Sequence, residues 1–254
     1  MKSRYKLSFI LLLLSLNLFS QSTSVFPQPT DLVTCPTAGI LPRGAFLMDA
    51  NLYRDGGLLF GMAVGVSGNL MFGISYGGSQ IVGNQDVLWN EQPGVEVKYR
   101  LFEEGMSHPA LALGFNSEGY GAYMKDLKRY EQKAKGFYCT LSKNFDLFGN
   151  LGFHGGANFN PLENQKDKDR DPSVFFGIDK DINSEISIFG EWDAAINDND
   201  LDKMTFGKGY LNAGVRFNIV EHFHFEVLFT DILMNNKNID HINRELRINF
   251  IEFF

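Results

Sequence analysis

Hydrophobic and polar residues alternate along the last stretch of the chain, residues 242–254. In an extended strand, one face would carry four apolar residues, Leu246, Ile248, Phe250 and Phe254. The opposite face would carry Glu245 and Arg247. This period of two predicts a strand with one apolar and one polar side. A free apolar edge invites pairing with other chains, whereas the closing strand of a barrel has no free edge. We therefore expect a closing strand here, with the edge strand of a soluble β-domain as the alternative.

The same alternation predicts eleven further strands. Their approximate ranges are 44–53, 58–66, 70–76, 95–101, 111–116, 137–141, 151–159, 174–178, 186–193, 211–219 and 223–230. With the last stretch they make about twelve, an even number. Most approach the roughly 9–11 residues that a tilted strand needs to cross a bilayer.

The predicted connections alternate in length. Asp55-Gly56-Gly57 is a strong hairpin signal. From there short turns, such as 67–69 and 183–184, alternate with long loops, such as 78–92 and 161–172. Outer-membrane barrels place short turns in the periplasm and long loops outside. The pattern predicts an all-β, transmembrane, antiparallel up-and-down β-barrel.

The inward face of the predicted strands is rich in charge, which would be very costly in a dry core. The candidate lumen-lining residues are Asp49, Glu96, Lys98, Arg100, Glu191, Asp193, Arg216, Glu226, Glu245 and Arg247. Two interpretations stay open: mutually paired charges that fill the barrel, or a polar channel or ligand site. In the second, the arginines and Lys98 would contact an anionic or sugar ligand.

The N-terminus resembles a cleavable secretory signal peptide, predicted over residues 1–22. Lys2, Arg4 and Lys6 precede an apolar core from Phe9 to Phe19, and small residues follow. Residues 23–43 are Pro-rich and are predicted to be a periplasmic N-terminal segment. Residues 44–254 would form the outer-membrane β-barrel.

Composition and net charge limit the classes of binding partner that the chain is expected to have. The formal charge is −7, which argues against nucleic acid. Outer-membrane lipid and lipopolysaccharide, and the barrel-assembly machinery, are the expected partners. Cys35 and Cys139 could pair in an oxidising compartment, but Cys139 also fits as a small apolar strand residue.

Metal and catalytic motifs are weak. Alternating carboxylates at 167–171, and those of Asp198, Asp200 and Asp202, favour solvated acidic loops over calcium sites. The five histidines are scattered, and no G-x-S-x-G, HExxH or phosphate loop occurs. We expect no enzyme, no metal and no cofactor. Aromatic residues near strand ends are expected to form interface girdles: Tyr53, Tyr76, Tyr99, Trp192, Tyr210, Phe253 and Phe254.

Two resemblances add to this. The four apolar residues of the last strand are similar to the C-terminal insertion signal of bacterial outer-membrane barrels. The stretches Cys35–Gly44, Gly94–Leu101 and Pro109–Phe115 resemble the YjbH-like family of outer-membrane proteins, which is associated with exopolysaccharide production. The second resemblance covers about residues 35–125, and the chain would correspond to one barrel-like portion of a longer family member.

Three functions are compatible with these features. The resemblance implies a barrel accessory to exopolysaccharide secretion or surface-polymer assembly, with polysaccharide or secretion-locus proteins as possible partners. A small passive porin-like channel for sugars or other small solutes is the alternative. A structural or adhesive surface barrel without transport is the third.

Overall fold

The computed structural model describes residues 28–163, 169–199, 204–220 and 222–254. The predicted signal peptide, the central part of the predicted loop 161–172, and Asp200 and Asp202 lie outside these ranges. Among the described residues no helix is both long and apolar enough to cross a membrane.

Within these ranges the chain forms fifteen strands and one short 3-10 helix, Ile196–Asp198. The strands are β1 Ala45–Tyr53, β2 Gly57–Gly65, β3 Leu70–Ser79, β4 Leu88–Trp89, β5 Gly94–Phe102, β6 Ala110–Asn116, β7 Tyr120–Met124, β8 Arg129–Gln132, β9 Gly136–Asp146, β10 Asn150–Phe159, β11 Ser173–Asp181, β12 Ile186–Asp193, β13 Tyr210–Val220, β14 Phe223–Thr230 and β15 Asn243–Phe253.

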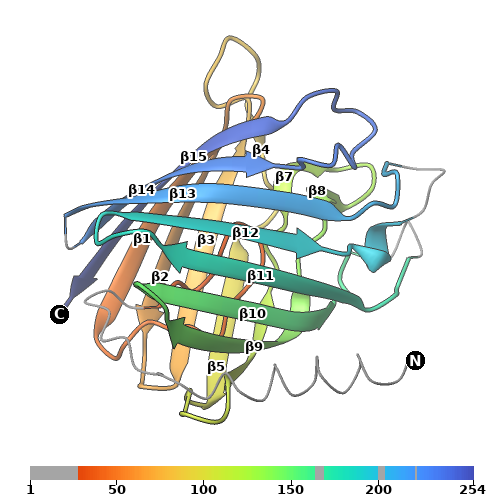
Figure 1. Ribbon diagram of the computed structural model, residues 1–254. Helices are drawn as coiled ribbons and strands as arrows, with labels where there is room; N and C mark the ends of the chain where they lie inside the picture. The colour runs from red at the N-terminus through yellow and green to blue at the C-terminus, as the bar shows by residue number, and fades with distance from the viewer. Residues whose placement is uncertain (1–27, 164–168, 200–203, 221) are drawn as a thin grey trace, which may run out of the picture.

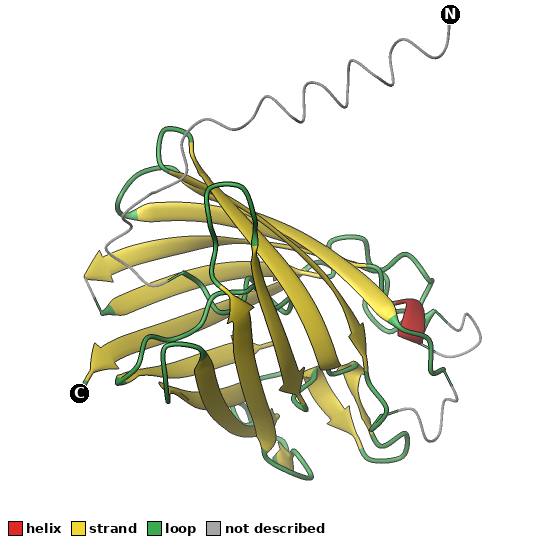
Figure 2. Cartoon of the chain, turned by 90° about the horizontal axis from the view of Figure 1, so that it is seen from below, coloured by secondary structure: helices red, strands yellow, loops and turns green. Residues whose placement is uncertain are grey.

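Twelve of these strands form a closed antiparallel barrel (Figures 1 and 2). The sheet runs from β2 through β1 and β15 round to β5 and β3, and pairing of β3 with β2 closes it. β4 only extends the end of β3, and β7 and β8 form a separate hairpin. The predicted twelve-stranded barrel is confirmed. The predicted closing role of the last strand also holds, because β15 pairs with both β1 and β14.

The barrel wall has an apolar outer face. Exposed positions along the strands include Phe60 and Met62 on β2 and Phe176 and Ile178 on β11. Inward neighbours such as Lys98 and Glu226 are fully buried. In water this outer face would be very unfavourable, whereas lipid solvates it, and a closed barrel satisfies every backbone group of the wall. The fold is therefore that of a transmembrane β-barrel of the outer-membrane type, as the alternation predicted.

The connections segregate by length. The tight turns 66–69, 147–149 and 182–185 lie at the end where β1 begins and β15 ends. The opposite end carries the short 54–56 turn and the longer segments 80–93, 117–135 and 194–209. Asp55 and Gly56 both have positive φ, 58° and 64°, as the predicted Asp-Gly hairpin requires. By the usual rule the turn end is periplasmic and the loop end is extracellular.

Two details differ from the sequence-based expectation. The connection between the predicted strands 111–116 and 137–141 contains the hairpin of β7 and β8, whose sequence pattern is too short for a clear period. Tyr53 and Tyr210, expected in the aromatic girdles, are buried and bond to Ser79 and Asp198 respectively. Their positions in the alternation match those of inward Asn51 and Asn212, which explains the error.

Candidate functional site

The segment that precedes β1 lies inside the barrel. We call its described part, residues 28–43, the plug segment. Ile40 and Leu41 pack on Ala45 and Met71 of the wall. Farther along the lumen, Leu32 and Val33 pack with buried residues of β12 and β14, Phe189 and Leu228. The segment expected to lie ahead of the barrel on the periplasmic side thus contacts opposite walls of its interior.

The plug segment is a compact fold-back. Asp31 and Pro36 form an antiparallel bridge, and the Thr37 N–H donates to the Thr30 carbonyl at 2.9 Å. The Leu32 N–H donates to the Cys35 carbonyl at 3.1 Å, which closes the turn. A Cβ at Gly39 would lie 2.4 Å from the Pro29 carbonyl oxygen, so glycine is required for this close approach.

The turn of the plug is bound by one carboxylate. Glu191 on β12 accepts the backbone N–H groups of Val33 and Cys35 at 2.9 and 3.0 Å on one oxygen. Its other oxygen accepts the N–H and the hydroxyl of Thr34, both at 2.8 Å, and Asn212 Nδ2 at 2.8 Å. Five donors thus surround the buried Glu191 carboxylate, and three of them are the consecutive backbone amides of Val33, Thr34 and Cys35. Consecutive amides that point at one anion bind it strongly.

Cationic groups bind the carbonyls of the plug. Arg247 donates to the Leu32 and Val33 carbonyls at 3.0 and 2.6 Å, and its guanidinium also lies 3.4 Å from Glu226. On the β5 side, Lys98 donates to the Thr30 carbonyl at 2.7 Å. Because Lys98 and Glu226 are fully buried, these pairs satisfy charges that could not stand alone.

A buried hydrogen-bond chain on β9 to β11 also fastens the plug. Ser142 Oγ lies 2.7 Å from His154 Nδ1, and His154 Nε2 lies 2.6 Å from Asp179 Oδ1. These residue types form the catalytic triad of serine hydrolases, in which His Nε2, and not Nδ1, faces the serine. Here the ring is reversed, and the buried Ser142 hydroxyl accepts the Ala38 N–H at 2.8 Å. The arrangement holds the plug and leaves Ser142 closed to a substrate.

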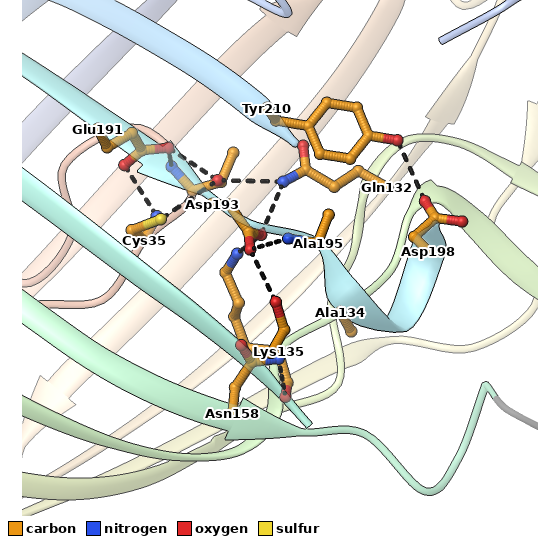
Figure 3. A network of polar contacts seen from close by, with 12 residues as sticks. Cys35, Gln132, Ala134, Lys135, Asn158, Glu191, Asp193, Ala195, Asp198 and Tyr210 are labelled. Atoms are coloured by element: carbon orange, nitrogen blue, oxygen red, sulfur yellow. Dashed lines mark hydrogen bonds and ion pairs between the residues drawn. The ribbon is translucent and has the colours of Figure 1, made fainter. Parts of the chain in front are cut away.

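At the outer mouth, loop residues and strand residues are joined by buried polar contacts, including those of Tyr210 with Asp198 and of Lys135 with Asp193 (Figure 3). Arg129 forms a buried bidentate pair with Asp198 at 2.8 and 2.9 Å, and Tyr210 donates to the same carboxylate at 3.1 Å. Lys135 pairs with Asp193 near the end of β12. These contacts hold residues 129–135 at the mouth, a position that no periodic pattern in the sequence indicates.

Gln132 joins the mouth to the plug. Its amide nitrogen lies 3.4 Å from both Thr34 Oγ1 and Asp193 Oδ2. Burial raises the pKa of the neighbouring Cys35 thiol well above its usual range, and the charge of Glu191 adds to this effect. Through Gln132, the plug segment and the loop residues 129–135 at the outer mouth are in direct contact.

A cavity of about 770 Å³ remains beside the plug. Its lining includes Phe148 and Ser184 at the turn end and Tyr120 and Lys133 at the loop end. Among the described residues eight carboxylates and four lysines or arginines line it, so its charged groups are mainly acidic.

The ten sequence-predicted lumen residues fall into distinct environments. Five line this cavity: Asp49, Glu96, Arg216, Glu226 and Arg247. Lys98 and Glu191 hold the plug, while Asp193 and Glu245 bind the outer loops through Lys135 and Tyr120. Arg100 lies at the turn end, where it pairs with Glu103 at 2.9 Å. Sequence reasoning missed Thr140 and Ser142, although their alternation with outward Cys139 and Leu141 marks them as inward.

The predicted insertion residues lie on the outer side of the last strand. Leu246, Ile248 and Phe250 pair in register with Leu52, Ala50 and Met48 of β1. The Phe254 N–H donates to the Gly44 carbonyl at 2.8 Å, and its ring lies 5.2 Å from that of Phe46. Recognition of these residues by an assembly machinery stays a prediction.

The cysteines are both free, Cys35 buried in the plug and Cys139 exposed on the outer face. Within the described ranges no group of three or more metal-binding side chains is present. Asp198, one of the candidate calcium ligands, instead pairs with Arg129.

No protein-family model matches the chain, and no curated protein matches it. These comparisons therefore do not assign the chain to the YjbH-like family. Similar solved structures are outer-membrane β-barrels. They include the KdgM porin (10% identity, TM-score 0.44, covering 83% of this chain and 99% of that one). The NanC porin is similar at 12% identity and a TM-score of 0.42, covering 82% and 99%. The outer membrane protein Omp33 of Acinetobacter baumannii is similar at 9% identity and a TM-score of 0.47, covering 83% and 97%. All three TM-scores are below 0.5, so the function of the lumen is inferred from its own geometry.

Proposed function

We propose that the protein is a passive outer-membrane channel for small hydrophilic solutes, with a bore that the plug segment narrows. The observation that carries the proposal is the cavity of about 770 Å³, which carries many charged residues and whose lining residues come from both ends of the barrel. A wall that only filled space would be expected to pair all of its charges. Among the described residues Asp49 and Asp181 face the cavity without a salt bridge, whereas Arg216 and Arg247 pair with Glu226.

The plug sets the size of the path. It is attached through hydrogen bonds to polar side chains on β5, β9, β12 and β15, such as Lys98, Glu191 and Arg247. Polar attachments of this kind can be exchanged for water, whereas a covalent or purely apolar core cannot. Release of the plug would also expose the buried apolar side chains of Leu32, Val33, Ile40 and Leu41, so we expect the released state to be a minor one in the intact chain.

Planar-bilayer recordings test the proposal. The intact chain and a variant lacking residues 28–41 are inserted separately, and single-channel conductance is measured in KCl. We expect small, discrete conductance for the intact chain and a several-fold larger value for the deletion variant. Silence of both folded proteins would exclude a channel.

A second candidate is the accessory barrel in polymer secretion that the YjbH-like resemblance implies. The covered outer mouth, with its buried Arg129–Asp198 pair, favours a barrel that does not conduct. Gene deletion followed by measurement of secreted polymer tests it. Reduced polymer together with a silent deletion variant would support this role over the channel.

A further inference from the structure

Two lysines converge on one exposed aromatic ring at the extracellular rim. The Lys208 and Lys237 ammonium groups lie 5.1 and 5.7 Å from the centroid of the Phe206 ring. The Phe206 side chain is 50% exposed. Two like charges at one ring repel each other, and the ring quadrupole offsets only part of that repulsion.

The backbone that carries these side chains is firmly held. The Phe206 N–H donates to the Asn235 carbonyl and the Lys237 N–H to the Met204 carbonyl, both at 2.8 Å. The Lys208 N–H donates to Asn235 Oδ1, also at 2.8 Å. Hydrogen bonds thus join segments 204–209 and 231–237, and this pairing brings Lys208 and Lys237 to the same Phe206 ring.

Neighbouring carboxylates are engaged elsewhere. Asp198 binds Arg129, and Asp231 accepts the Asn235 and Asn236 N–H groups. Asp240 bonds to His241. Within 169–199, 204–220 and 222–254 no carboxylate forms a salt bridge with either lysine, and Lys208 Nζ donates to the Leu233 carbonyl at 3.1 Å. The pair is therefore a cationic spot on a chain of net charge −7.

Its position matches lipid headgroups. Trp192, a lipid-facing residue near the extracellular end of β12, lies directly against the spot, with its indole nitrogen 3.4 Å from the Lys208 carbonyl. Tryptophan at this level marks the membrane interface. We infer that Phe206, Lys208 and Lys237 form a binding site for a phosphate of the phosphorylated glycolipid of the outer leaflet, with the apolar ring facing the sugar and acyl region.

Lipid binding to the purified, folded barrel tests this site. The probes are diphosphorylated lipid A, its dephosphorylated form and inorganic phosphate, and bound lipid is counted by native mass spectrometry. Near a membrane surface each lysine contributes about fivefold to anionic-lipid binding, so K208Q/K237Q should weaken lipid A binding by roughly 30-fold. F206A should weaken it by a smaller factor, because both lysines lose their shared support.

The matched control is K125Q/K128Q, which removes two lysines from the exposed tip of the β7–β8 hairpin. It should leave lipid A binding unchanged. Equal binding of the dephosphorylated lipid, or full binding by K208Q/K237Q, would overturn the proposal. Inorganic phosphate that binds as tightly as lipid A would also overturn it, in favour of a site for a soluble anion. Heat-dependent gel migration confirms that each variant is folded, and none of these outcomes depends on conductance.

Discussion

Thr34 of the plug and Glu191 on β12 are joined twice, through the backbone N–H and the hydroxyl of Thr34, each 2.8 Å from the same carboxylate oxygen. The second oxygen receives the amides on either side, from Val33 and Cys35. Without the carboxylate these buried amides would have no partner, and each unsatisfied group would cost about 1–3 kcal/mol. Glu191 is therefore a principal attachment of the plug.

Substitution of Glu191 by Gln should release the plug. The amide nitrogen would face backbone donors, so about half of the acceptor capacity is lost at the turn. A loss of roughly 1.5–3 kcal/mol raises the released population by about 10- to 100-fold. Cys35 reports this directly, because its thiol is buried and its raised pKa keeps it unreactive while the plug is seated.

The measurement is the rate of Cys35 alkylation by a water-soluble maleimide, in a Cys139→Ser background that removes the exposed thiol. Glu185→Gln, on an exposed turn, is the matched control and should not change the rate. If Glu191→Gln reacts no faster than its parent, Glu191 does not hold the plug.

Loss of Arg129 should open the outer mouth. Arg129→Ala leaves the buried Asp198 carboxylate with Tyr210 and without its cation, which costs about 3–5 kcal/mol for a buried pair. Protease cleavage within 117–135 should increase strongly in intact proteoliposomes. The double variant Arg129→Ala/Asp198→Ala removes the unpaired charge and should recover part of the protection. Equal cleavage of the parent and Arg129→Ala would show that other contacts close the mouth.

The barrel could be predicted from the sequence because an alternation with a period of two predicts a strand and also shows which residues lie on each of its faces. Lys98 and Glu226 stand opposite apolar neighbours along β5 and β14, so their inward direction follows from the alternation alone. The turn end and the loop end followed in the same way from the lengths of the connections.

The plug could not be predicted, because its contacts have no local signal. Residues 28–43 show no period, and their partners on the wall, such as Glu191, lie about 157 positions away in the chain. The inward charges indicated a wet lumen equally well whether they faced water or backbone amides. Only the folded arrangement distinguishes Glu191, which binds the plug, from Glu226, which lines the cavity.

Glu118 should make the outer loops sensitive to pH. Burial raises the pKa of its carboxyl from 4.5 to about 7, against the opposing hydrogen bond from Ser75. Asn90 Nδ2 lies 3.2 Å from the same carboxyl and ties segment 80–93 to it. Because the folded-state pKa is raised, the stabilising contribution is complete below about pH 4.5 and is lost as the pH rises through about 7.

Hydrogen exchange of segment 80–93, corrected for the intrinsic pH dependence of exchange, should therefore show a progressive loss of protection between about pH 4.5 and 7. Glu118→Gln stays neutral, so it should abolish this pH-dependent loss and keep above pH 7 the protection that the parent shows near pH 4.5. An identical pH profile in the variant would remove Glu118 as the titrating group.

The bore should prefer cations. Its lining carries eight carboxylates against four lysines and arginines, and fixed charge on a narrow wall raises the local concentration of counter-ions. Under a KCl gradient at pH 8 we expect a reversal potential that shows K⁺ several-fold more permeant than Cl⁻. Screening shortens the reach of fixed charges from about 10 Å at 0.1 M salt to about 3 Å at 1 M, so the preference should shrink as salt rises. Asp49→Asn should lower it because Asp49 faces the cavity, whereas Asp146→Asn, outside the cavity lining, should not. An anion preference, or one that Asp49→Asn leaves unchanged, would mean that ions do not pass along this cavity.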